Sequence, residues 1–397
     1  MMKEENNVKV CKDYSFVRGM HCGYAGKTPE RWHADLELGK RVGLNSTRIW
    51  LSYDGYRQSP DTYFDEIKQY FHVCAEHGYT VIPILFNGNG INAADPYELE
   101  ERFLPEGEAF CRAVVAALKD EPNLIMYDVM NEPGCNHLIW DAKDEAEKKY
   151  WLDKHWAFIR HFCRYMKQID PDNAITVGHW LSEYIEEAAD LVDVLSYHDY
   201  SSSLKGIIEN ADRALAAGRK WGKPVINNET GCIGRGNAYD LVIQALNERH
   251  IPWYIFGLIC EGYWSDIHGI FYPDGTVRDP AIVAALLGFY RNRDYGTIIP
   301  EKPNREKLAV QAVRRVERLL LDEADDCFRY QGVTAEALLD ACDELACFLE
   351  AGQLVPMRIP PTAKVAYFRK QKEPNMLEIK QFAFDMAKTL KDSCFIL

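Results

Sequence analysis

The sequence lacks a long apolar run, a surplus of basic residues and any paired-cysteine motif. No stretch reaches 18 consecutive apolar residues, so neither a membrane-spanning helix nor a membrane partner is expected. The formal charge is −14, from 60 acidic and 46 basic residues, which does not suit a polyanion binder, and nucleic acid is not an expected partner. The twelve cysteines form no C-x-x-C pair, so no zinc or redox site is predicted, and no other metal or cofactor is predicted either.

The amino-terminal segment and the cysteines bear on the cellular compartment. Residues 1–16 lack the apolar core of a signal peptide. Twelve scattered cysteines in a chain without such a leader are typical of reduced thiols. The sequence therefore predicts a cytoplasmic protein.

What is present is the composition of a folded protein with a sizeable core. Hydrophobic residues make up 47% and charged residues 27% of the 397 positions. This length has room for one α/β barrel, about 250 residues in its usual form, and an appendage. Nine tryptophans and 22 tyrosines suit a sugar-binding cleft, although most aromatic side chains in any protein lie in its core.

Short apolar runs alternate with helical patterns over the first 295 residues. The runs are typical of strands buried on both faces, and there are eight of them: 16–20, 46–51, 80–86, 124–129, 174–177, 192–196, 224–227 and 252–259. Helical periodicity connects most of them, over 29–42, 60–77, 99–119, 143–169, 204–221, 238–249 and 280–293. This alternation predicts a closed (β/α)₈ barrel over residues 1–295. An open doubly wound sheet is the alternative, but residues 19–24 read GMHCGY and lack its G-x-G-x-x-G turn.

The texture changes after residue 300. Amphipathic helices are predicted over 305–324, 334–351 and 376–391, with a short strand over 365–369. Residues 300–397 are thus expected to form a small, mainly helical domain with no catalytic motif. We expect this domain to cover barrel helices; alternatively, it binds a partner or makes an oligomer.

Candidate reactive residues follow the predicted strands, where barrel enzymes place their chemistry. Glu132, in the run YDVMNEPG, follows the fourth strand, and Glu229 follows the seventh. Glycoside hydrolysis needs two such carboxyl groups, one to protonate the leaving oxygen and one to attack or to activate water. Alone, a glutamate at a strand end is more often a surface or ion-paired group. The further candidates at strand ends are Arg48, Trp180, His198, Tyr200 and Trp264.

This constellation resembles clan A of the glycoside hydrolases, family 5 (the cellulase and mannanase family) in particular, over residues 14–293. The resemblance implies that Glu132 is the acid/base and Glu229 the nucleophile. It also implies sugar or carboxylate contacts for Asn131, Arg48, His198, Tyr200 and Trp264. The family's usual histidine after the third strand is missing, since residues 86–89 read FNGN, so its role is vacant or falls to Asn87 or His21.

We expect a retaining hydrolase whose substrate is a β-linked gluco- or manno-configured oligosaccharide or small glycoside. Asn131 and Glu132 both reach the site only if the strand end is irregular, and Pro133 favours this by biasing Glu132 toward an extended conformation. One rival is a phosphate-handling isomerase or aldolase, suggested by the glycine-rich residues 231–236, although no strand end offers a Schiff-base lysine. The other is a sugar-binding barrel without catalysis.

Overall fold

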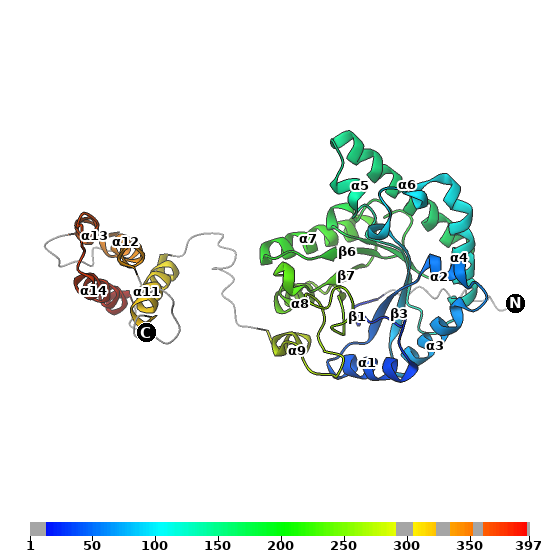
Figure 1. The fold of residues 1–397 in the computed structure, drawn as a ribbon, viewed down its shortest axis with the longest axis horizontal. Helices are drawn as coiled ribbons and strands as arrows, with labels where there is room; N and C mark the ends of the chain where they lie inside the picture. Colours follow the sequence, from blue (N-terminus) through cyan, green and yellow to red (C-terminus); the bar gives the residue numbers. More distant parts are fainter. Residues whose placement is uncertain (1–12, 291–304, 323–333, 352–359, 395–397) are drawn as a thin grey trace. The chain divides into compact units, whose positions relative to one another are not determined.

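The computed structural model describes residues 13–290, 305–322, 334–351 and 360–394, and residue contacts divide the chain into two compact units, Met1–Arg293 and Asp294–Leu397. The first unit contains a closed barrel of eight parallel strands that follow one another in chain order (Figure 1). The strands are β1 (Arg18–His21), β2 (Ser46–Trp50), β3 (Thr80–Asn87), β4 (Tyr127–Asn131), β5 (Ile175–His179), β6 (Leu195–Asp199), β7 (Val225–Thr230) and β8 (Trp253–Ile255). The predicted (β/α)₈ barrel is confirmed, and the open sheet is excluded.

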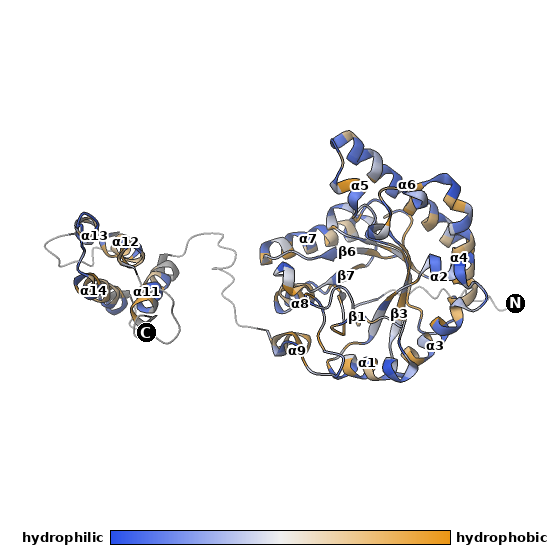
Figure 2. Cartoon of the chain, in the orientation of Figure 1, coloured by the Kyte–Doolittle hydropathy of each residue, from blue (hydrophilic) through white to orange (hydrophobic). Residues whose placement is uncertain are grey.

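Helices surround the barrel and connect most of its strands. They are α1 (Pro29–Arg41), α2 (Tyr53–Gln58), α3 (Tyr63–Glu76), α4 (Leu104–Leu118), α5 (His137–Trp140), α6 (Glu145–Ile169), α7 (Leu204–Trp221), α8 (Tyr239–Glu248) and α9 (Pro280–Leu286). In Figure 2 these helices carry both hydrophilic and hydrophobic colours, as helices with one buried face do. None of the helices in the described residues is both long and apolar enough to span a membrane.

Several strands extend further into polar sequence than predicted. The apolar runs over 124–129, 192–196 and 224–227 stop before the strands do, because β4, β6 and β7 end at Asn131, Asp199 and Thr230. These polar ends are buried as fully as the apolar residues before them. A buried polar group needs partners, so the mouth of the barrel must hold a dense hydrogen-bond network.

The second unit contains four described helices: α11 (Arg305–Asp322), α12 (Ala335–Ala351), α13 (Pro361–Arg369) and α14 (Met376–Cys394). Their apolar faces pack on one another around residues such as Val316, Leu345 and Met386. The predicted strand over 365–369 is wrong, because this segment lies in α13. Proline at the first helical position favours this start, and Val365 and Phe368 are buried on one helical face.

Candidate active site

A cavity of about 650 Å³ opens at the carboxyl ends of the barrel strands. Of the predicted site residues, it is lined by Asn87, Asn131, Glu132, Trp180, His198, Tyr200, Glu229 and Trp264. Arg48 is fully buried and contacts Glu229, and His21 lines a smaller adjoining cavity with Trp264. The structure therefore brings all ten candidates to one end of the barrel.

Glu132 stands where β4 breaks its regular path. The pairing of β4 with β5 shifts between Asp128 and Asn131, and the Glu132 N–H donates to the Gly178 carbonyl at 2.7 Å. The backbone φ of Glu132 is +48°, in the left-handed region that non-glycine residues rarely occupy. The expected irregular strand end is present, but the extended conformation expected from Pro133 is wrong. Such strain persists only where surrounding contacts enforce it, and it aims the side chain into the cavity.

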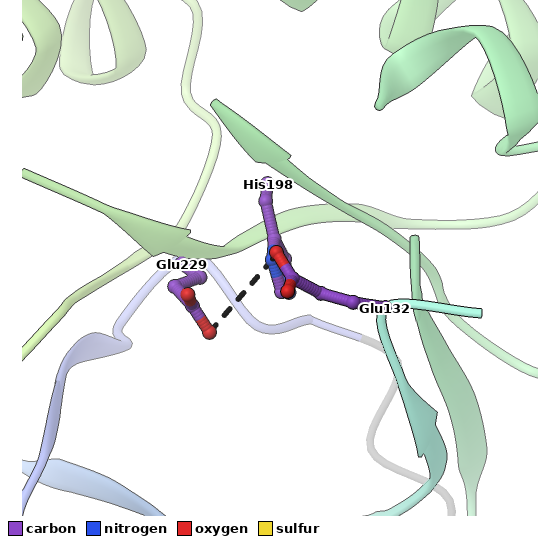
Figure 3. A group of neighbouring side chains, drawn as sticks. All are labelled: Glu132, His198 and Glu229. Atoms are coloured by element: carbon purple, nitrogen blue, oxygen red, sulfur yellow. Dashed lines mark hydrogen bonds and ion pairs between the residues drawn. The ribbon is translucent and has the colours of Figure 1, made fainter. Parts of the chain in front are cut away.

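The Glu132 carboxylate has two side-chain partners. Its Oε1 lies 2.9 Å from Nδ1 of His198, at the end of β6 (Figure 3). Its Oε2 accepts a hydrogen bond of 2.7 Å from Nδ2 of Asn89. Asn89 belongs to a short 3₁₀ turn, η1 (Gly88–Gly90), that follows β3. The side chain that reaches Glu132 from the end of β3 is thus Asn89, which was not among the candidates.

Asn87 and His21 contact other groups. Asn87 Oδ1 accepts a hydrogen bond of 3.0 Å from Nδ2 of Asn131. His21 Nε2 lies 3.1 Å from the Asn228 carbonyl, which can only accept, so this nitrogen carries the proton. Burial, with the charge of Arg48, holds the pKa of His21 well below its ordinary value, so the ring is neutral.

Glu229 lies at the end of β7 and has strong donors. Arg48 Nη1 donates to its Oε2 at 3.0 Å, and the Tyr200 hydroxyl donates to its Oε1 at 2.8 Å. His198 Nδ1 lies 3.7 Å from Oε2, between the two carboxylates, as Figure 3 shows. One oxygen of Glu132, one of Glu229 and the His198 nitrogen all lie within 4.8 Å of one another.

Arg48 is held by a second carboxylate, Asp128, beneath the cavity. Its Nε and Nη2 donate to Asp128 Oδ2 at 3.0 and 2.7 Å, and neither side chain is exposed. Asn228 Nδ2 donates to the same oxygen at 3.0 Å, and the Gly178 N–H donates to Oδ1 at 3.0 Å. A Cβ at Gly178 would lie 2.6 Å from Arg48 Nη2, so only glycine leaves room for the guanidinium.

The two reactive carboxyls have opposite pKa directions. Burial raises the pKa of Glu229, and the charge of Glu132 adds to it against the lowering effect of Arg48. Burial alone would also raise the pKa of Glu132, but the hydrogen bonds from His198 and Asn89 bring it below its ordinary value. These directions are the reverse of what the implied roles need, since an acid must hold a proton while the nucleophile is ionised.

His198 can be a hydrogen-bond donor or an acceptor toward Glu132. With the ring proton on Nδ1, His198 donates to an ionised Glu132; with it on Nε2, Nδ1 accepts from a protonated Glu132. The buried Nε2 has no hydrogen-bond partner among the described residues, so no protein contact fixes the tautomer. The contact with His198 is therefore compatible with either protonation state of Glu132.

The cluster of Glu132, His198 and Glu229 could also accommodate a cation, and no other such group occurs in the described parts of the chain. The positive guanidinium of Arg48, 3.0 Å from Glu229, opposes a metal ion there. The site is therefore better suited to proton transfer than to metal binding.

Aromatic side chains form the walls of the cavity. Besides Trp180 and Trp264, they include Trp50, Trp140 and Phe256, which were not among the candidates. Trp264 and Trp140 are 47% and 54% exposed, so their rings are open to a ligand. Trp140 lies on α5, and no motif in the sequence marks that helix.

Comparison with known families bears on what this arrangement does. The family model described as cellulase (glycosyl hydrolase family 5) matches residues 7–259. The chain belongs to glycosyl hydrolase family 5. The family 5 barrel is a glycosidase, which favours this activity over the phosphate-handling isomerase and the purely sugar-binding protein. Comparison with curated proteins finds no match.

Solved structures of other glycosidases share the fold of this family 5 protein. The endo-β-1,4-mannanase of Thermotoga petrophila is 14% identical over 72% of this chain and 78% of its own, with a TM-score of 0.52. The endo-1,4-β-mannanase of Rhizomucor miehei is 16% identical over 68% and 92%, with a TM-score of 0.53. The endoglucanase of Pseudomonas stutzeri is 14% identical over 70% and 94%, with a TM-score of 0.53.

Proposed function

We propose that this family 5 glycosidase hydrolyses β-linked gluco- or manno-configured oligosaccharides with retention of configuration. The observation that carries the proposal is the short gap between the carboxylates, with oxygens of Glu132 and Glu229 within 4.8 Å. Retaining enzymes hold their carboxyl groups about 5–5.5 Å apart, whereas inverting enzymes need roughly 6.5–9.5 Å to admit a water molecule. Structural neighbours named mannanase and endoglucanase support the substrate class.

Glu229 is the nucleophile in this proposal. Its oxygens receive hydrogen bonds from Arg48 and Tyr200, which orient the carboxylate and favour its ionised form. In the first step Glu229 attacks the anomeric carbon, the bond to the leaving oxygen breaks, and a glycosyl ester forms.

Glu132 is the acid and then the base. It protonates the leaving oxygen in the first step, and in the second it takes a proton from the water that displaces Glu229. These roles need Glu132 protonated and Glu229 ionised when the substrate is bound, so binding must reverse the order of the two pKa values. The unfixed tautomer of His198 allows this, since Nδ1 can accept from a protonated Glu132.

The test compares two variants with product analysis. Glu229→Ala should lose on the order of 10³-fold or more in kcat, because no other group can form the ester, and azide should restore turnover with inverted product. Glu132→Gln should slow substrates with poor leaving groups most, because good leaving groups need no proton. Proton NMR of the first sugar released by the wild-type enzyme decides the stereochemistry: an α-anomer from a β-glycoside would refute retention.

The cytoplasmic location, an oligomer formed through residues 300–397 and the lack of catalytic groups there remain parts of this proposal. The packing of α11–α14 around a core of their own supports a structural role for this unit.

A further inference from the structure

Arg235 places a positive charge at the wall of the catalytic cavity. It ends the 3₁₀ turn η5 (Ile233–Arg235) that follows β7, and it lines the cavity with the two reactive carboxylates. Its guanidinium carbon lies 4.8 Å from the centre of the Tyr200 ring. The hydroxyl of that ring donates to Glu229, so a ligand that reaches Glu229 also comes near Arg235.

This guanidinium has no carboxylate partner among the described residues. Arg160 and Arg249, also on the barrel, each meet an aspartate, at 2.6 and 2.8 Å, whereas no described acid forms an ion pair with Arg235. Among the described residues that line the cavity, it is also the one arginine or lysine, beside Glu132, Asp199 and Glu229. A free cation in a cavity otherwise rich in carboxylates indicates a site for an anionic ligand group.

The turn that carries Arg235 is exposed, but the residues next to it attach it to the barrel mouth. The side chain of Asn237 is buried; it accepts a hydrogen bond of 2.9 Å from the Gly231 N–H and donates one of 2.7 Å to the Ser201 carbonyl. A Cβ at Gly234 would lie 2.4 Å from the Ile267 side chain, so the turn packs closely on the loop after β8. These contacts fix the backbone from which the guanidinium extends.

We propose that Arg235 binds an anionic substituent, a carboxylate or a phosphate, on the sugar at or next to the bond that is cleaved. The preferred substrate is then an acidic gluco- or manno-configured oligosaccharide, an inference that rests on the proposed hydrolysis. A planar guanidinium makes two parallel hydrogen bonds to such an oxyanion, and the Tyr200 ring supports its flat face. Without this charge, the cavity carboxylates would repel an acidic sugar.

The experiment compares three nitrophenyl β-glycosides of one ring configuration: the glucoside, the glucuronide and the 6-phosphoglucoside. Wild-type kcat/KM should be higher for at least one charged glycoside than for the glucoside, and the preferred one identifies carboxylate or phosphate. Arg235→Gln should lower the ratio of charged to neutral kcat/KM by about 10- to 100-fold, the loss expected for a charge-assisted hydrogen bond. Arg235→Lys keeps the charge without the planar guanidinium, so its ratio should lie between those of the wild type and Arg235→Gln.

Arg112→Gln is the matched control, because it removes one positive charge from α4, where Arg112 contacts Tyr165, and should leave the ratio unchanged. An equal loss on all three glycosides in Arg235→Gln would overturn the proposal, since Arg235 would then only position Tyr200. Wild-type turnover of the glucoside alone would also overturn it while leaving the proposed hydrolysis intact. Absence of turnover on charged and neutral glycosides, oligosaccharides included, would overturn both.

Discussion

Asp128→Asn tests whether the buried network beneath the cavity holds the nucleophile in place. The Asp128 carboxylate accepts four hydrogen bonds, three of them on Oδ2 from Arg48 and Asn228 and one on Oδ1 from the Gly178 N–H. An asparagine has one acceptor oxygen and one NH₂ group. Whichever way the amide turns, its NH₂ group faces a donor, and Arg48 loses one of its two charged partners.

The loss of stability expected for Asp128→Asn follows from the burial of Asp128 and Arg48. Breaking a fully buried ion pair on one side costs about 3–5 kcal/mol of unfolding free energy. For a domain near this size, 3 kcal/mol lowers Tm by roughly 6–12 °C. With Asp128 neutral, the Arg48 charge acts more strongly on Glu229 and lowers the pKa of that carboxyl, so the acidic limb of the activity profile should move to lower pH.

The assay is thermal unfolding together with kcat/KM against pH on an aryl glycoside. Asp170→Asn is the control: this carboxyl is also buried, but its partners are Tyr127 and Asn173 rather than a cation. It should cost about 1 kcal/mol and leave the pH profile alone. A Tm of Asp128→Asn within 2 °C of wild type, with an unmoved acidic limb, would refute the role assigned to this network.

Three further predictions concern single groups or units. Tyr200→Phe removes a donor that favours ionised Glu229, so it should raise the pKa of Glu229 and shift the acidic limb of kcat/KM to higher pH; an unmoved limb would contradict this. Burial lowers the pKa of His155 to about 4, whereas the unfolded chain binds a proton at this residue below about pH 6.5. The free energy of unfolding should therefore fall between about pH 6.5 and pH 4, by up to about 1.4 kcal/mol per pH unit. Urea unfolding at several pH values should show a shallower decline in His155→Gln, and an identical decline would rule out this group. A chain that ends at Arg293 should keep kcat/KM within about twofold, because α11–α14 pack around their own core; loss of activity in a soluble, cooperatively folded truncate would assign that unit a catalytic part.

The barrel could be predicted from sequence because its strands are short, apolar and regularly spaced. Their polar ends could not, since Asn131 and Thr230 look like loop residues until the barrel mouth buries them. Asp128 gave a signal that was missed: a lone acid inside a strand buried on both faces needs a charged partner. Asn89 and Trp140 gave none, because each reaches the cavity from a loop or short helix whose path depends on tertiary packing.

The backbone conformation of Glu132 is another feature that could not be predicted from sequence. Proline after a residue favours an extended conformation, and the left-handed φ of +48° arises instead from contacts distant in sequence. Among them is the hydrogen bond from the Glu132 N–H to the Gly178 carbonyl on the neighbouring strand. Local preference was overridden where the reacting group had to turn into the cavity.

The pairing of Arg48 with both Asp128 and Glu229 sets the charge balance of the interior throughout the proposed catalytic cycle. Before reaction, two carboxylates face one guanidinium. The excess negative charge stabilises the positive charge that develops on the sugar ring. Once the glycosyl ester forms, Glu229 is neutral, yet Arg48 is still matched by Asp128. The covalent intermediate therefore never leaves an isolated cation in the barrel, and hydrolysis of the ester restores the original excess of negative charge for the next substrate.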